Sequence, residues 1–396
     1  MADAIRVNEK KAGDTVMRLL SIEGLSGGER PVADAIRGIL RGIGIPARAM
    51  TFDGAERRMK LPEMRCGNLV VEIPGEGRSK RAFSAHMDTV TLARGASPVL
   101  RGRRVFPKGD TALGADDRSG VAAILSGLRT VIELGLPHPP LVLIFTAGEE
   151  IGLFGSRYVD RSALRGVRLA FNFDGGSPGE FDIGAPSSDH FTIEVTGIAS
   201  HAGSAPEKGA SAVAAAAAAI SQLKSRGWFG RVRKGRLSGT SNVGRFTAEG
   251  PTNIVSPRAV IEGESRSHSD AFLGRITAEF RRAFEKACRA TRAADGRTAH
   301  AHFRSERIYA TFRLKASDPV VRFGLRAAKA AALDPRLVVG GGGLDANFFN
   351  GYGMPTLTMG AGAHDVHTPA EWLDLDEHLA ACRLAAALMT VREGEA

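Results

Sequence analysis

Histidines and acidic residues follow several apolar runs of the sequence, at the positions where strands would end. His86 and Asp88 come at the end of the run that begins Arg81-Ala-Phe-Ser-Ala. On a strand, residues i and i+2 point to the same face, so these two side chains can meet. A metal-bound imidazole usually donates its other N–H to a carboxylate, which fixes the tautomer and the ring orientation. The pair therefore fits a metal site in which Asp88 orients His86.

Further candidate ligands stand in the same kind of position along the chain. In order, they are Asp116, Glu149, Glu150, Asp174 and His367. Two imidazoles with several carboxylates suit Zn²⁺, Mn²⁺ or Co²⁺, and they do not form a thiolate site. The excess of carboxylates suits two metal ions roughly 3.5–4 Å apart, because one carboxylate must bridge the pair. Asp116, just before a predicted helix, is placed to be that bridge.

The adjacent acids Glu149 and Glu150 predict a division of labour. Neighbouring residues of an extended chain point in opposite directions, so at a strand-to-loop junction one can bind metal while the other faces the substrate. Metal binding lowers the pKa of a bound water to around 7, so a carboxylate suffices as its general base. The motif therefore predicts hydrolysis by a metal-activated water.

The arrangement of apolar runs predicts an α/β fold. Leu141–Thr146 is continuously apolar, as in a parallel strand that is covered on both faces, and similar strands alternate with helical patterns. We expect a mostly parallel-sheet catalytic domain with helices on both faces, formed by residues 1–186 and 313–396. Its site would lie at the carboxyl edge of the sheet. The stretch between Asp88 and Gly114 is expected to be irregular.

Between residues 187 and 312 the pattern changes. Alternating strands near 191–195, 242–246 and 259–267 accompany helices at about 210–224 and 270–291. Alternation indicates strands with one exposed face. We therefore predict an inserted α+β domain, with two helices on one face of its sheet.

Composition limits the class of protein. The 396 residues are 43% hydrophobic, which is typical of a soluble globular chain of two domains. No segment approaches the roughly 18 apolar residues of a membrane helix, and the N-terminus lacks a signal-peptide core, so a cytoplasmic protein is expected. The three cysteines are far apart, which argues against disulfides.

The net charge is +10, and residues 187–312 hold 19 Lys and Arg against 11 Asp and Glu. Such an excess raises nucleic acid as a partner. However, there is no long basic run, and aromatic residues are not interleaved with the basic ones as stacking platforms would be. We therefore expect a solvated basic face that could steer anionic substrates, and no nucleic-acid or membrane partner.

Ten short segments carry a family resemblance. They are Ser84–Val90, Leu113–Gly120, Phe145–Gly152, Asn172–Gly176, Ala199–Gly203 with Pro206–Gly209, Thr252–Val255, Gly263–Ser267, Gly342–Asn347 and His367–Glu371. In this order, they resemble the M20 family of metallopeptidases, especially its peptidase T-like (tripeptidase) branch.

The resemblance implies two metal ions, usually zinc, with cobalt or manganese sometimes substituting. His86 and Asp174 would hold one ion, Glu150 and His367 the other, and Asp116 would bridge them. It also implies a cis peptide between Asp116 and Asp117.

The resemblance implies catalytic and binding roles as well. Glu149 would be the general acid/base, Asp88 would orient His86, and His201 would reach the substrate carbonyl oxygen, where a donor stabilises developing negative charge. The residues expected to bind substrate are Arg266 and Asn253, which would grip its carboxylate, and Asp345 and Asn347, which could instead only shape their loop. The insertion would be a lid domain that commonly forms a homodimer.

Three positions differ from the family pattern or compete with it. Arg118 stands where many relatives have Lys, and Leu344 where a small hydroxyl residue is common. His364 lies three residues before His367, but His367 matches the His-x-x-x-Glu block. The sequence thus predicts a di-metal exopeptidase of short peptides, in the first place an aminotripeptidase. A dipeptidase, carboxypeptidase or N-acyl-amino-acid deacylase remains an alternative, as does a catalytically silent binding protein.

Overall fold

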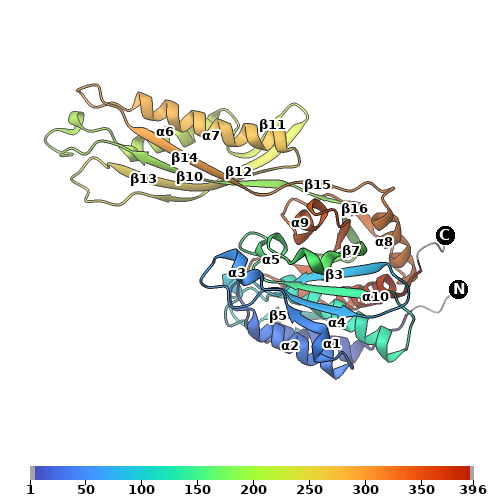
Figure 1. The fold of residues 1–396 in the computed structure, drawn as a ribbon. Coiled ribbons are helices and arrows are strands. Elements are labelled where there is room, and N and C mark those ends of the chain that lie inside the picture. The colour runs from blue at the N-terminus through green and yellow to red at the C-terminus, as the bar shows by residue number, and fades with distance from the viewer. Residues whose placement is uncertain (1–4, 393–396) are drawn as a thin grey trace. The chain divides into compact units, whose positions relative to one another are not determined.

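The computed structural model describes residues 5–392, and the chain divides into two compact units (Figure 1). The first unit comprises Met1–Gly184, Arg313–Gly340 and Leu344–Ala396, and the second comprises Ala185–Phe312 with Gly341–Gly343. The chain passes from one unit to the other through β9 (Gly184–Ala185) and returns through β15 (Phe312–Arg313). The second unit is therefore an insertion in the first.

An eight-stranded sheet forms the centre of the first unit. In spatial order its strands are β1 (Met50–Phe52), β2 (Leu69–Ile73), β6 (Leu141–Thr146), β3 (Lys80–His86), β7 (Val167–Phe173), β17 (Thr356–Met359), β8 (Glu180–Asp182) and β16 (Arg336–Val338). The central strands β6, β3, β7 and β17 are parallel, whereas β1 and β2 are antiparallel to their neighbours. Parallel neighbours end at the same edge, so the carboxyl ends of these four strands meet.

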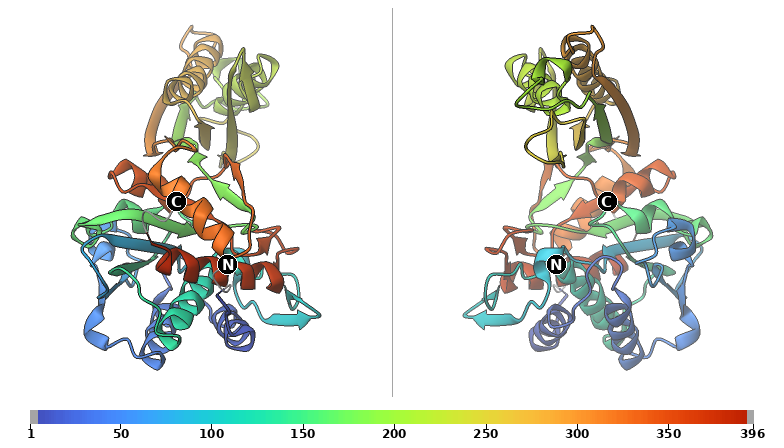
Figure 2. Two further views of the ribbon diagram at one scale, coloured as in Figure 1. Left: turned by 90° about the vertical axis from the view of Figure 1, so that its right-hand side faces the viewer. Right: turned by 90° about the vertical axis from the view of Figure 1, so that its left-hand side faces the viewer.

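Helices cover both faces of this sheet, which confirms the predicted α/β class. They are α1 (Glu9–Leu20), α2 (Arg30–Gly42), α3 (Ala55–Met59), α4 (Ala115–Glu133), α5 (Phe154–Arg157), α8 (Pro319–Ala330), α9 (Asp345–Gly351) and α10 (Leu375–Thr390). Helices α1, α2 and α4 lie on one side, and α5 and α9 on the other (Figures 1 and 2). Because both faces are covered, every residue of β6 is buried.

Aromatic packing fills one side of the sheet. Phe83 of β3 contacts Phe171 of β7, and Phe171 contacts Phe323 of α8, with ring centroids 5.5 and 5.8 Å apart. On the opposite side, Ala82 and its neighbours in β6 pack against the fully buried Phe349 of α9. The central strands thus have no exposed face, and the edge where they end is where polar side chains can gather.

One expectation about the first unit is wrong. The stretch between Asp88 and Gly114 contains a hairpin of β4 (Pro98–Arg101) and β5 (Arg104–Pro107), joined by Gly102 and Arg103. Gly102 has φ +62, which the two-residue turn requires. The strands have four residues each, too few for a clear alternation. Together with β18 (Ala363–His364) and β19 (Trp372–Asp374) they form a four-stranded sheet.

The second unit is a five-stranded antiparallel sheet with two helices. In spatial order the strands are β11 (Gly230–Lys234), β12 (Leu237–Thr247), β13 (Arg258–Ser267), β10 (Ser187–Thr196) and β14 (His300–Tyr309), and the helices are α6 (Ala212–Ser225) and α7 (Asp270–Ala290). Ser211 and Ser269 start the helices by accepting hydrogen bonds from Ala214 N and Phe272 N. Strands β11 and β14 were not anticipated.

Alternate residues of these strands form the core of the second unit. Ile193, Val232 and Ile261 are fully buried, and they belong to one cluster with Ala216 of α6 and Phe280 of α7. The residues between them in each strand point to the other face of the sheet. Within residues 5–392, no helix is long and apolar enough to cross a membrane.

The buried His378 of α10 should make the stability of the fold depend on pH. Its side chain is fully buried next to the Cys382 thiol, and burial lowers its pKa to about 4. The unfolded chain would bind a proton at this residue near pH 6.5, whereas the folded chain would remain neutral there. Between pH 6.5 and pH 4, proton binding therefore favours the unfolded chain. The free energy of unfolding is highest above pH 6.5 and decreases as the pH falls toward 4.

We predict that His378→Met removes part of the pH dependence of stability. Between pH 7 and pH 5, the free energy of unfolding of the unaltered protein should fall by about 2 kcal/mol more than that of the variant. Urea denaturation at the two pH values measures the difference. His138→Met, at a partly exposed histidine of the same unit, is the control. Equal losses in the His378 variant and the unaltered protein would contradict the prediction.

Candidate metal centre

The parallel strands bring the predicted ligands to one edge of the sheet. Strand β3 ends at His86, β6 ends three residues before Glu149, and β7 ends immediately before Asp174. Asp116 lies at the start of α4, and His367 lies in the loop between β18 and β19. Because β6, β3 and β7 are adjacent and parallel, the side chains that follow them share one edge.

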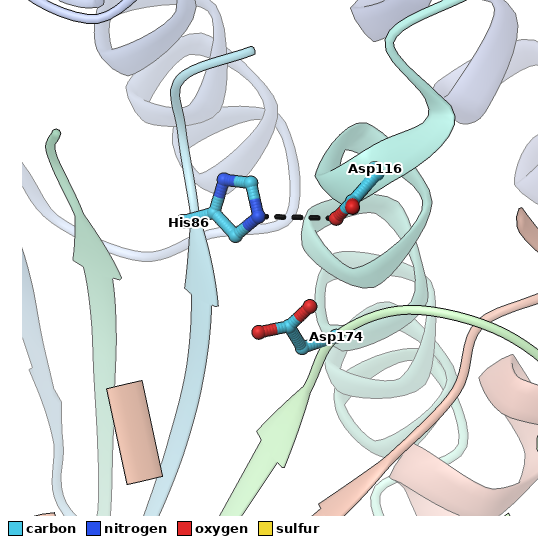
Figure 3. A group of neighbouring side chains, drawn as sticks. All are labelled: His86, Asp116 and Asp174. Carbon is cyan, nitrogen blue, oxygen red and sulfur yellow. Dashed lines mark hydrogen bonds and ion pairs between the residues drawn. The ribbon is translucent and has the colours of Figure 1, made fainter. Parts of the chain in front are cut away.

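Two groups of side chains have ligand atoms within 4.8 Å of one another. His86, Asp116 and Asp174 form the first, in which His86 Nε2 lies 3.1 Å from Asp116 Oδ1 (Figure 3). The second consists of Asp116, Glu150 and His367. His367 Nε2 lies 3.0 Å from Glu150 Oε1 and 3.3 Å from Asp116 Oδ2. The two oxygens of Asp116 thus face different groups.

This edge of the sheet concentrates negative charge in a buried place. Burial, followed by the repulsion of nearby acids, raises the pKa of Glu149 and of Asp174 well above the usual range. Burial also acts to raise the pKa of Asp116, but hydrogen bonds from His367 and His86 outweigh it and lower that pKa. The hydrogen bonds of His367 to Asp116 and to Glu150 raise the pKa of His367 to about 10. A bound cation would offset the repulsion among these carboxylates. Carboxylates and imidazoles are also the donors that divalent transition-metal ions prefer.

Asp88 lies behind this edge and is fully buried. Its carboxylate accepts hydrogen bonds from Glu149 N at 3.0 Å, Glu150 N at 3.1 Å and the Ser26 hydroxyl at 2.6 Å. His86 Nδ1 is closer to the Asp88 carbonyl oxygen, at 3.0 Å, than to the carboxylate, at 3.5 Å. When the ring is neutral and Nδ1–H donates to Asp88, the lone pair is on Nε2, so Nε2 is the ring atom that could bind a metal ion.

Asp117 explains how the start of α4 is positioned. Its carboxylate accepts hydrogen bonds from His86 N and from Gly120 N, both at 3.1 Å, so it links the end of β3 to the first turn of the helix. A Cβ at Gly120 would lie only 2.3 Å from Asp117 Oδ1, so this position needs glycine. The Asp116–Asp117 peptide is cis, as the resemblance implied.

Glu371 anchors the same helix start from the C-terminal part of the chain. Its buried carboxylate accepts hydrogen bonds from Leu113 N, Gly114 N and Asp116 N, at 2.9, 3.0 and 3.0 Å. His367, four residues earlier, has φ +64, a left-handed conformation that costs a non-glycine residue about 1–2 kcal/mol. The His-x-x-x-Glu block therefore serves two purposes: it presents an imidazole and it holds Asp116.

Residues missed by the sequence analysis complete the support. Besides Ser26, they include Glu29, a buried carboxylate that accepts hydrogen bonds from Gly27 N at 2.9 Å and Gly148 N at 3.0 Å. Burial, and then the charge of Asp88, raises the pKa of Glu29 to about 7. The segment Ser26–Glu29 could be recognised in the sequence only as a break between two helices, because nothing local connects it with a strand end sixty residues away.

Arg118 is a fully buried cation among these acids. It donates a hydrogen bond to the Gly24 carbonyl oxygen at 3.2 Å, and burial lowers its pKa to about 10 even though Asp88, Glu29 and Asp117 act to raise it. At this depth the guanidinium would compensate part of the negative charge. Arg118, which stands where many relatives have Lys, is therefore not a candidate metal ligand but a buried cation beside the candidate ligands.

Asp345 and Asn347 are buried at the start of α9. The Asp345 carboxylate accepts a hydrogen bond from the Thr146 hydroxyl at the end of β6, and Asn347 Oδ1 accepts one from Leu344 N at 2.9 Å. Of the two interpretations considered for this pair, these contacts favour the one in which it shapes the loop.

The second unit carries the other predicted site residues. His201 is exposed, and its Nδ1 accepts hydrogen bonds from Gly203 N and Ser204 N, both at 3.1 Å. An accepting Nδ1 places the proton of the neutral imidazole on Nε2, which is then available as a donor. Asn253 is exposed, with its backbone oxygen bonded to Ala202 N, and Arg266 lies on β13, with its guanidinium 3.0 Å from Glu264.

Comparisons with known proteins agree with this geometry. Residues 82–391 match the model of peptidase family M20/M25/M40. The uncharacterized protein YqjE of Bacillus subtilis is 30% identical over 387 residues, which cover 97% of this chain and 98% of that protein.

Two solved structures resemble the chain over nearly its whole length. Aminopeptidase PepT from Bacillus cereus has a TM-score of 0.82 and 29% identity, and covers 97% of this chain and 98% of its own. A tripeptidase from Staphylococcus aureus has a TM-score of 0.85 and 26% identity, with the same coverage. The chain therefore belongs to peptidase family M20/M25/M40. Within this family of hydrolases it is peptidase T-like, as the sequence predicted.

We predict that Glu371→Ala disorders the site without touching a candidate ligand. Three backbone N–H groups would lose their acceptor, which should lower the free energy of unfolding by at least about 2 kcal/mol. Because Asp116 N is one of the three, calorimetric titration with Zn²⁺ or Mn²⁺ should also show weaker binding. Asp376→Ala, at an exposed acid bonded to Arg103, is the control. Unaltered stability and metal affinity in the Glu371 variant would exclude this role.

Proposed function

We propose that the protein is a di-metal exopeptidase of short peptides, and specifically an aminotripeptidase. The observation that carries the proposal is the Asp116 carboxylate, whose two oxygens face separate groups of ligand atoms. A single bridging carboxylate between two sets of histidine and acid is what a pair of divalent cations requires. The aminopeptidase and tripeptidase named above support the branch.

In this proposal His86 and Asp174 hold one ion, Glu150 and His367 hold the other, and Asp116 is shared. Zinc fits the donor set best, and cobalt or manganese could replace it. Two such ions would polarise the substrate carbonyl and make a water more acidic. All other steps belong to side chains of the protein.

Glu149 is proposed as the general base and acid. It belongs to neither ligand group, and within residues 5–392 its carboxylate accepts no hydrogen bond, while its backbone N is held by Asp88. It is buried and directly precedes Glu150, so it would lie beside the ions without being needed to bind them. Glu149 would take a proton from the attacking water and return it to the leaving amine.

His201 is proposed as the donor to the carbonyl oxygen. Two backbone N–H groups already occupy its Nδ1, so only Nε2–H is left to donate, and negative charge developing on the oxygen strengthens that bond. Arg266 and Asn253 are proposed to bind the substrate carboxylate. The assignment of residues 187–312 as a lid and dimerisation domain also stays a prediction.

A panel of peptides tests the function. Chelator-stripped protein should hydrolyse no peptide, and adding back Zn²⁺, Mn²⁺ or Co²⁺ should restore the release of the amino-terminal residue from tripeptides. Cleavage of N-acylated substrates or of dipeptides instead would move the enzyme to the deacylase or dipeptidase alternative. Release of the C-terminal residue would indicate a carboxypeptidase. No hydrolysis with any metal would overturn the proposal in favour of a binding protein.

The adjacent glutamates provide a matched pair of variants. Glu149→Gln should retain two metal ions per chain and lose turnover by about 10²-fold or more, because a proton acceptor is removed while the ligands remain. Glu150→Gln should lose one ion, since an amide is a poor substitute for a ligating carboxylate. Metal content by elemental analysis and initial rates distinguish the two. Metal loss in the Glu149 variant, or near-normal turnover, would contradict the assignment.

A further inference from the structure

A cavity in the second unit is lined by an unusual number of cationic side chains. Its volume is about 210 Å³, and all of its lining residues belong to that unit: Pro186, Arg231, Arg233, Ser238, Gly239, Thr240, Arg266, Ser267, His268 and Gly341. Three arginines and a histidine line it together with hydroxyl groups, and no carboxylate is among the lining residues. The cavity is smaller than the roughly 300 Å³ of a site for a whole drug-sized ligand, so it suits one side chain or a small anion.

Strand register explains why the arginines meet. Arg231 of β11 is paired with Thr240 of β12, which is paired with Arg266 of β13. Residues paired across neighbouring strands project from the same face, so the three side chains form one row, with the backbones of the two arginines roughly 10 Å apart. This is the face of the sheet opposite α6 and α7, because the intervening Val232 is buried in the helix-covered core.

Arg233 extends the row along β11. It is two residues from Arg231 and therefore points to the same face, at a spacing of about 7 Å. It is paired with Ser238. Both arginines are exposed, and their neighbours across the hairpin offer only hydroxyl groups.

The charge of these two arginines is not balanced locally. Other arginines in the strands of this sheet have carboxylate partners: Arg245 with Glu262, Arg258 with Glu194, and Arg266 with Glu264. Within residues 5–392, Arg231 and Arg233 have no ion pair and no hydrogen-bond acceptor. Guanidinium groups recognise carboxylates through paired N–H donors, so this arrangement is prepared for a second anion beside the one that Arg266 would bind.

We propose that the cavity is an anion subsite for the side chain of an acidic C-terminal residue of the substrate. Arg266 would hold the terminal carboxylate, as proposed above, and Arg231 and Arg233 would hold the side-chain carboxylate of Asp or Glu. This inference rests on the proposed peptidase function and adds the substrate class to it. The confined volume favours a side chain over an extended polyanion such as nucleic acid.

The test compares two tripeptides that differ only in a C-terminal Glu or Gln, which have nearly the same shape. The double variant Arg231→Gln/Arg233→Gln should lower kcat/KM for the Glu peptide by about tenfold or more relative to the Gln peptide, mainly through KM, since charged hydrogen bonds contribute about 1.5–3 kcal/mol. Arg236→Gln, in the same hairpin but outside the cavity, removes one charge as well and should keep the original ratio of the two peptides.

The outcomes separate the inference from the function on which it rests. Equal effects of the double variant on both peptides, or an equal shift with Arg236→Gln, would overturn the subsite and leave the peptidase intact. Binding of inorganic phosphate that the double variant abolishes, without a preference between the peptides, would also overturn it and indicate a site for a free anion. If neither peptide is hydrolysed, the proposed function fails. Calorimetric titration with the same two peptides would then show whether the cavity still prefers the C-terminal Glu over the C-terminal Gln.

Discussion

The whole first unit depends on holding several carboxylates together in a buried place. Ionised acids at such short distances repel one another and lose hydration, so the fold can keep them there only with compensating partners. The Asp116 carboxylate contacts both imidazoles. The carboxylates of Asp117 and Glu371 accept hydrogen bonds from backbone N–H groups, and Arg118 adds a buried positive charge. What remains is a concentration of negative charge that favours the binding of divalent cations.

Parallel topology provides the geometry for this arrangement. Strands β6, β3 and β7 are covered on both faces and end at one edge, so residues far apart in the chain come within ligand distance. The supporting contacts come from still more distant segments: the loop at Ser26–Glu29 reaches Asp88 and Gly148, and Glu371 reaches the start of α4. Side chains from several distant segments thus bond the backbone around the candidate ligands.

The second unit is organised by a different principle. Its antiparallel sheet is covered by helices on one face only, so the other face is free to present polar side chains in rows set by strand register. The arginines around the cavity lie on this face. His201 lies in the loop between β10 and α6, where two backbone N–H groups bond its Nδ1. The first unit thus contains a buried group of acids, and the second presents an exposed polar surface with positive charge.

The sequence by itself determined the family, the α/β class, the insertion and the residues that could bind metal, because these depend on short motifs, apolar periodicity and residue type. It did not reveal the hairpin at Pro98–Pro107, whose strands are too short for a periodic signal. Only the tertiary structure decided which candidate ligands lie on either side of Asp116, and that Asp345 and Asn347 are buried at the start of α9. It also decided that Ser26, Glu29 and Glu371 support the site, and that Arg231 lies in register with Arg266. These features depend on contacts between distant segments and on cross-strand register, which no local pattern of residues encodes.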